Sequence, residues 1–141
     1  MAVLVTGGAG YIGSHMVLAL LDAGHDSVVV LDDLSTGFDW ALPPEVTLVV
    51  GDVADQALVA GIIREHGIDA LAHFAARIVV PDSVADPLGY YLANTVKTRA
   101  LIETAVREGV RHVIFSSTAA VYGEPDIVPV PEDLLTAPIN P

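Results

Sequence analysis

The chain of 141 residues contains no cysteine, so disulfide bonds and catalysis by a thiol are excluded. Basic residues are scarce: 6 Lys and Arg stand against 18 Asp and Glu, which gives a formal net charge of −12. That charge does not suit nucleic acid or an anionic membrane, so we expect neither as a partner. No apolar run approaches the roughly 18 residues of a membrane span, and no basic segment precedes an apolar one at the N-terminus. We therefore expect a cytoplasmic protein.

Apolar residues are abundant: they make up 52% of the chain and give a mean hydropathy of +0.57. Strands of a parallel sheet that are buried on both faces read as continuous apolar runs, which explains the excess. These runs alternate with helical patterns, which predicts an α/β fold with a doubly wound parallel sheet. We expect strands at 2–7, 27–32, 46–51, 70–75 and 112–117, and helices at 12–23, 56–66 and 90–108. In the last helix we expect one apolar face made of Leu92, Val96, Ala100, Leu101, Ala105 and Val106.

The most informative stretch is the Gly-rich segment that runs from Thr6 to Gly13, between the first apolar run and the first helical pattern. A turn between a strand and a helix N-terminus is where the pyrophosphate of a dinucleotide binds. Gly7 allows the tight turn, Gly10 lets the backbone approach the phosphates, and Gly13 lets the helix pack closely on the sheet. The segment therefore predicts a dinucleotide-binding site.

A pair of carboxylates, Asp32 and Asp33, follows the second apolar run. A carboxylate about 20 residues past the Gly-rich turn accepts hydrogen bonds from the adenosine ribose hydroxyls. It would repel the 2′-phosphate of NADP, and no Arg or Lys lies between Asp32 and Asp39. We therefore predict NAD as the cofactor, with Asp32 on the ribose and Asp33 in a solvated turn.

The third strand closes on Asp52 and Val53, at the edge where a cofactor's adenine would lie. Asp52 has two interpretations that the sequence leaves open. Its carboxylate either accepts a hydrogen bond from the adenine amino group or caps the helix that begins near Gln56.

Small and polar residues close the fourth and fifth strands. The fourth ends at His73, Phe74, Ala75 and Ala76, whose backbone would lie along the cofactor's sugars. We interpret His73 as a satisfied core histidine and not as a catalyst. The fifth ends at Ser116, where a hydroxyl points into the ligand crevice.

Taken together, these segments resemble a known family. The chain is similar to the N-terminal part of the extended short-chain dehydrogenases/reductases, and among them to the UDP-glucose 4-epimerase family. The resemblance implies a Rossmann-like sheet of five strands in the order 3-2-1-4-5. It rests on Thr6–His15, Leu31–Gly37, Gly51–Asp52, His73–Ala76, Tyr90–Asn94 and Phe115–Gly123, which follow one another at near-family spacing.

The resemblance also implies an activity, the interconversion of UDP-glucose and UDP-galactose. In that family NAD takes a hydride from C4 of the sugar, leaving a 4-keto intermediate, and returns it to the opposite face. A Tyr whose pKa is lowered by a nearby Lys is the base, and Thr118 matches the residue that hydrogen-bonds the same hydroxyl. Asn94 matches the Asn of the central helix, which we count with the cofactor-binding residues, and Tyr11 and Ile12 would supply phosphate-binding amides.

The family's Tyr-x-x-x-Lys is absent from the chain, and we expect it directly after Pro141. The only Lys, Lys97, lies in the central helix. The 141 residues alone are therefore expected to be inactive, and a non-catalytic NAD-binding module remains an alternative. A nucleotide-sugar dehydratase is disfavoured, because those enzymes carry Asp-Glu where Ala119–Ala120 follows Thr118 here.

The composition changes after Gly123. Residues 124–141 hold five of the nine prolines, which break any regular element. We expect a dinucleotide-binding domain at 1–123 and a Pro-rich loop at 124–141. We also expect the fifth strand to be a sheet edge whose apolar residues, Val113 to Phe115, promote association or homo-oligomer formation.

Overall fold

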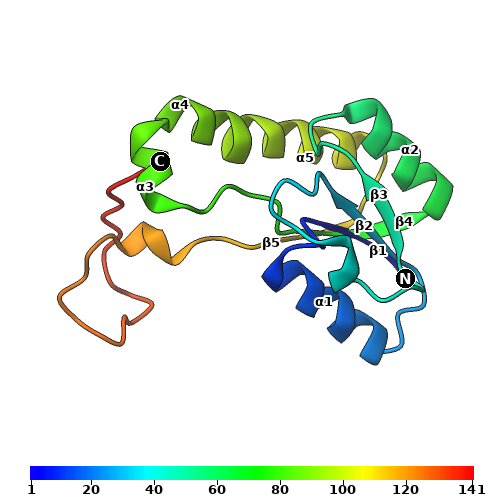
Figure 1. The fold of residues 1–141 in the computed structure, drawn as a ribbon, viewed down its shortest axis with the longest axis horizontal. Coiled ribbons are helices and arrows are strands. Elements are labelled where there is room, and N and C mark those ends of the chain that lie inside the picture. The colour runs from blue at the N-terminus through cyan, green and yellow to red at the C-terminus, as the bar shows by residue number, and fades with distance from the viewer.

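The apolar runs form one parallel sheet whose strands lie in the order β3-β2-β1-β4-β5, which confirms the predicted fold (Figure 1). The computed structural model describes residues 1–141. Each strand is four to six residues long, and its ends fall within a few residues of those predicted. The strands are β1 (Ala2–Thr6), β2 (Val28–Asp32), β3 (Thr47–Val50), β4 (Ile68–His73) and β5 (His112–Phe115).

Helices cover both faces of the sheet, as the doubly wound pattern requires (Figure 1). Helix α1 (Tyr11–Asp22) lies on one face, and α2 (Gln56–His66) and α5 (Lys97–Arg107) lie on the other. Alternate residues of β1 enter the two cores: Val3 and Val5 belong to the cluster on the α1 side, and Leu4 to the larger cluster under α2 and α5. Because both faces are buried, the strand is apolar throughout.

The helix predicted at 90–108 is longer than expected and is not α-helical throughout. It starts at α4 (Pro87–Tyr90), passes through the π-helical segment η2 (Tyr91–Val96) and continues as α5. A π-helical segment widens the turn and often occurs at functional sites. Three short elements were not predicted, because proline or a length under seven residues hides their periodicity: α3 (Val80–Ala85), η1 (Asp39–Ala41) and η3 (Ala119–Tyr122).

The predicted apolar face of this helix is wrong in part. Leu101 and Ala105 are buried, but Leu92, Val96 and Val106 are 53%, 52% and 71% exposed. Leu92 and Val96 lie within the wider π-helical turn, which interrupts the regular 3.6-residue period and shifts the side chains after it, including Val106. The face of α5 that is buried is instead made of Thr98, Leu101, Thr104 and Ala105.

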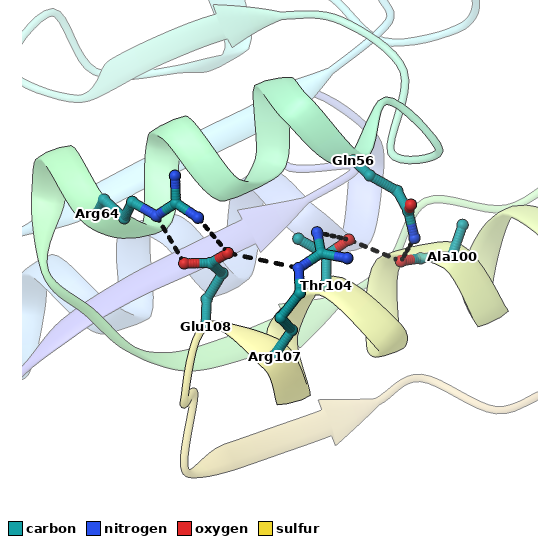
Figure 2. A network of polar contacts seen from close by, with 6 residues as sticks. All are labelled: Gln56, Arg64, Ala100, Thr104, Arg107 and Glu108. Carbon is teal, nitrogen blue, oxygen red and sulfur yellow. Dashed lines mark hydrogen bonds and ion pairs between the residues drawn. The ribbon is translucent and has the colours of Figure 1, made fainter.

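Polar contacts join α2 to α5 above the sheet (Figure 2). The guanidinium of Arg64 donates to both oxygens of Glu108, at 2.7 and 2.6 Å. Gln56, at the other end of α2, donates to the carbonyl oxygen of Ala100 at 3.3 Å. The hydrogen bond from Arg64 holds the pKa of Glu108 below its ordinary value. The two helices are therefore tied at both ends.

The last residues, 124–141, contain no helix or strand. They lie beside α3, away from the sheet (Figure 1). Three hydrogen bonds attach the segment: the Ala137 backbone amide donates to the Val121 carbonyl at 2.8 Å, the Asn140 side-chain amide donates to the Ser83 hydroxyl at 2.8 Å, and the Tyr122 hydroxyl donates to the Glu132 carbonyl at 3.4 Å. The division at residue 123 stays a prediction. No helix of the structure combines the length and apolar character that a bilayer crossing would take.

Candidate functional site

The site lies at the carboxyl ends of β1 and β4, where the strand order reverses. Ligands of open α/β sheets bind at such a switch point. The Gly-rich turn leaves β1 here and packs against the chain that leaves β4. Gly7 has a φ of +72°, and a Cβ at this position would lie 2.5 Å from the backbone nitrogen of Ala75. No other residue type fits this contact, because both the backbone conformation and the available space exclude a side chain.

The same turn leads into the N-terminus of α1. A Cβ on Gly13 would lie 2.1 Å from the Gly7 carbonyl oxygen, so close packing within the protein explains this glycine. Gly10 differs, since its Cβ would meet only that oxygen, at 3.3 Å. Gly10 is the N-cap of α1, and no side chain caps the helix. The turn therefore leaves open space in front of uncapped amides, including those of Tyr11 and Ile12, which fits a phosphate group.

Asp32 holds this turn in place, a role that the sequence did not reveal. The residue is 7% exposed, and one oxygen of its carboxylate accepts a hydrogen bond from the Ala9 amide at 2.9 Å. The other oxygen accepts the amide of Leu34, also at 2.9 Å. Leu34 has a φ of 55°, a left-handed conformation that this bond helps to maintain. Asp33 instead accepts the Ser35 amide in an exposed turn, at 2.9 Å.

Asp52 does not cap the following helix. The N-cap of α2 is Asp55, whose side chain accepts the amides of Ala57 and Leu58, so this interpretation of Asp52 is wrong. The carboxylate of Asp52 accepts the Ala54 amide at 2.8 Å and pairs with the ammonium of Lys97 on α5.

Burial acts to raise the pKa of Asp52, but the hydrogen bonds from Lys97 and from the Ala54 amide outweigh it and hold the pKa below its ordinary value. The neighbouring Val53 is buried in the larger core cluster. A ligand that reaches this strand end therefore meets an ionised carboxylate.

The segment after β4 is anchored from the central helix. Asn94, in η2, accepts the Arg77 amide through its side-chain oxygen at 2.8 Å and donates to the Arg77 carbonyl at 2.9 Å. Phe74 packs against the smaller core cluster, Ala75 against the larger one, and Ala76 is exposed. The structure thus gives Asn94 a visible role in placing this segment, and its contact with a cofactor stays a prediction.

The end of β5 presents its hydroxyl groups to solvent. Ser116 and Thr118 are both exposed, and the Ser116 amide donates to the His73 carbonyl at 3.1 Å. The Thr118 hydroxyl oxygen accepts the Ala120 amide at 3.1 Å and so caps η3. That bond uses the oxygen as an acceptor, which leaves the hydroxyl hydrogen available for donation.

Two clefts border this region. The larger, about 710 Å³, lies between the β2 turn and the segment that follows β4. Its lining includes Ser35, Thr36, Ala76 and Arg77. The smaller, about 470 Å³, borders the Gly-rich turn and shares Thr36 with the first. Of the predicted site residues, Gly10, Tyr11 and Ala76 line these clefts.

A Gly-rich turn at the switch point, held by an acidic residue at the end of β2, defines a dinucleotide-binding domain of the Rossmann-like class. The chain belongs to the NAD dependent epimerase/dehydratase family, whose sequence profile matches residues 3–141. NAD is the cofactor of this family, in agreement with the prediction from Asp32.

The relatives are consistent with the sequence resemblance. The chain is 53% identical over 139 residues to the UDP-glucose 4-epimerase of Azospirillum brasilense. This match covers 99% of this chain and 40% of the relative. Its fold matches the UDP-glucose 4-epimerase of Brucella ovis in complex with NAD, with a TM-score of 0.91 and 40% identity, over 99% of this chain and 42% of that one. It also matches the enzyme of Bifidobacterium longum in complex with NAD+ and UDP, with a TM-score of 0.89 and 38% identity, over 97% of this chain and 43% of that one. The chain thus spans about two fifths of the length of these relatives.

Proposed function

We propose that this chain is the NAD-binding part of a UDP-sugar 4-epimerase that interconverts UDP-glucose and UDP-galactose. The observation that carries the proposal is the Gly-rich turn at the switch point, which Asp32 holds from β2. The arrangement leaves an open, uncapped helix N-terminus for a pyrophosphate and places a carboxylate beside it. Identity of 53% to a UDP-glucose 4-epimerase supports the choice of reaction.

Residues at the different strand ends bind different parts of the cofactor. Asp32 receives the ribose hydroxyls, because each of its oxygens retains a lone pair after accepting one amide. Asp52 and Val53 receive the adenine, and Phe74 to Ala76 lie along the sugars on the β4 side. Ser116 lies towards the nicotinamide end. When it is bound, NAD supplies the hydride acceptor and donor for C4 of the sugar.

Thr118 is the residue of this chain that we assign to the reaction. Its hydroxyl donates a hydrogen bond to the oxygen at C4 of the sugar and so holds that oxygen for proton transfer. Its geometry supports this role, because the Ala120 amide already occupies one lone pair of the oxygen and restricts the orientation of the hydroxyl. The proposed base, a Tyr with a Lys four residues later, lies outside these residues.

The substrate that we propose is a nucleotide sugar with a UDP group. Support comes from the related enzyme of Bifidobacterium longum, which was crystallised with NAD+ and UDP. The larger cleft, between the β2 turn and the segment after β4, opens beside the proposed cofactor site.

The test uses the full-length protein that contains these residues, with UDP-galactose as substrate. We expect formation of UDP-glucose without added reductant, and we expect Thr118→Val to lower kcat roughly a hundredfold. Thr136→Val, at an exposed threonine of the 124–141 segment, is the matched control and should leave kcat unchanged. Binding of NAD without any epimerisation by the wild-type protein would contradict the proposal and support a non-catalytic NAD-binding module.

A further inference from the structure

Three residues form a row across neighbouring strands at the edge that carries the site. In the register of the sheet, Thr6 on β1 pairs with His73 on β4, and His73 pairs with Phe115 on β5. The imidazole of His73 stacks on the ring of Phe115, with centroids 5.7 Å apart. His73 is thus the middle member of a row that spans the switch point.

Both ring nitrogens of His73 have hydroxyl partners. Nδ1 lies 2.6 Å from the Oγ1 of Thr6, and Nε2 lies 2.8 Å from the Oγ1 of Thr98 on α5. A neutral imidazole donates from one nitrogen and accepts at the other, and a threonine hydroxyl suits either partner. His73 is 3% exposed, and no buried side-chain polar atom is left without a partner. The interpretation of His73 as a satisfied core histidine is therefore confirmed.

An apolar side chain would fill this position with a smaller desolvation free energy. Burying an imidazole and two hydroxyls removes them from water, and only the two hydrogen bonds offset that loss. Burial also lowers the pKa of His73 to about 4, which keeps the ring neutral near pH 7. A directional link in the core specifies relative positions more narrowly than apolar contact does.

The three groups that meet at His73 each lead directly to a part of the site. Thr6 immediately precedes Gly7, the first glycine of the turn. Phe115 precedes Ser116, whose amide donates to the carbonyl of His73 itself. Thr98 lies one helical turn after Asn94, which anchors the segment that follows β4. The imidazole therefore joins the Gly-rich turn, the end of β5 and the central helix.

We propose that His73 is a positioning residue for the cofactor site, which sets the Gly-rich turn relative to the central helix through Thr6 and Thr98. It touches neither cofactor nor substrate in this role. Loss of the link weakens NAD binding by displacing the turn, and lowers kcat by misaligning the end of β5 with the cofactor. The inference rests on the proposed function, since it takes NAD as the ligand.

The experiment compares two buried threonines of α5 in the full-length protein. Thr98→Val removes the hydroxyl that contacts His73. Thr104→Val is the matched control, because Thr104 is also buried and its hydroxyl contacts only its own helix: it donates to the Ala100 carbonyl at 3.0 Å and accepts from the guanidinium of Arg107 at 3.4 Å. The dissociation constant of NAD is measured by calorimetric titration of the apoprotein, and kcat and KM with UDP-galactose are measured on the holoenzyme.

We expect Thr98→Val to weaken NAD binding about tenfold, the ratio that corresponds to loss of one buried hydrogen bond. Thr104→Val should change it less than about twofold. A second pair varies the histidine. His73→Leu should weaken NAD binding at least as much as Thr98→Val does, and His73→Asn, whose short amide reaches towards Thr6, should recover part of the affinity.

Two results would overturn the inference: equal effects of Thr98→Val and Thr104→Val, or wild-type NAD affinity and kcat in folded His73→Leu protein. If His73→Leu does not fold, the threonine pair decides. A wild-type protein that neither binds NAD nor epimerises would instead overturn the proposed function, so the two failures are distinguishable.

Discussion

The carboxylate of Asp32 lies 2.9 Å from the backbone nitrogen of Ala9 and accepts a hydrogen bond from it. This bond joins the end of β2 to the middle of the Gly-rich turn, over 23 residues of sequence. A residue predicted to bind the cofactor therefore also shapes the loop that is predicted to bind the phosphates.

Asp32→Ala should weaken NAD binding by about tenfold or more, because the loop amide and the ribose lose a charged acceptor together. The preference for NAD over NADP should fall as well, since the repulsion of the 2′-phosphate is removed. Calorimetric titration with both dinucleotides measures the two effects. Asp33→Ala is the matched control, as its exposed carboxylate serves only the Ser35 turn. Equal affinity of the wild-type protein for NADP and NAD would contradict the role of Asp32.

Asp52 can be tested by changing the exocyclic group of the adenine. Nicotinamide hypoxanthine dinucleotide carries a carbonyl oxygen in place of the adenine amino group, so this exocyclic position can no longer donate to a carboxylate. We expect the wild-type protein to bind it more weakly than NAD, by about fivefold to tenfold. In Asp52→Ala the two dinucleotides should bind alike. The same discrimination in Asp52→Ala as in the wild type would show that another group recognises the adenine.

The buried His73 predicts a specific pH dependence of stability. Its pKa is about 4 in the folded protein, against 6.5 ordinarily, so the unfolded chain takes up a proton between these values and the folded protein does not. The free energy of unfolding should therefore fall as the pH drops from about 6.5 to 4, by up to about 3 kcal/mol, and should then level off with respect to this group.

Urea unfolding at several pH values measures this slope. His73→Gln should flatten the stability profile between pH 6.5 and 4, whereas His112→Gln, on the exposed strand β5, should not. Asp52, Asp69 and Glu108 have lowered pKa values and lose their stabilisation at lower pH, below the ordinary range of a carboxyl. An unchanged slope in His73→Gln would refute the prediction.

The edge strand β5 predicts association of these 141 residues when they are expressed on their own. β5 pairs only with β4, and Val113, Ile114 and Phe115 are 46%, 57% and 57% exposed. Sedimentation velocity should show self-association that rises with concentration, because an unpaired apolar edge pairs with another chain. Ile114→Lys should reduce it, while Ile127→Lys, at an equally apolar residue with 56% exposure, should not. A monodisperse wild-type monomer at high concentration would disprove this.

Much of the fold could be read from the sequence, because local patterns carry it. The run Val28–Leu31 is apolar at every position, as both-face burial requires, and Gly7 occupies a turn that needs positive φ. Short elements such as α3 were missed, since six residues that include Pro81 show no helical period. The face of the central helix was partly wrong because a π-helical segment leaves no signal in hydrophobic spacing.

The amino-acid sequence alone indicates the alternation of the five strands with the longer helices, the place of the Gly-rich turn and an acidic residue that is predicted to favour NAD. These features depend on residues close together in the chain, where period and turn chemistry act directly. The tertiary structure decided which side chains meet: Asp32 with Ala9, Asp52 with Lys97, and His73 with both Thr6 and Thr98. Those pairs lie 23 to 67 residues apart, and only the strand register and the packing of α5 on the sheet bring them within hydrogen-bonding distance.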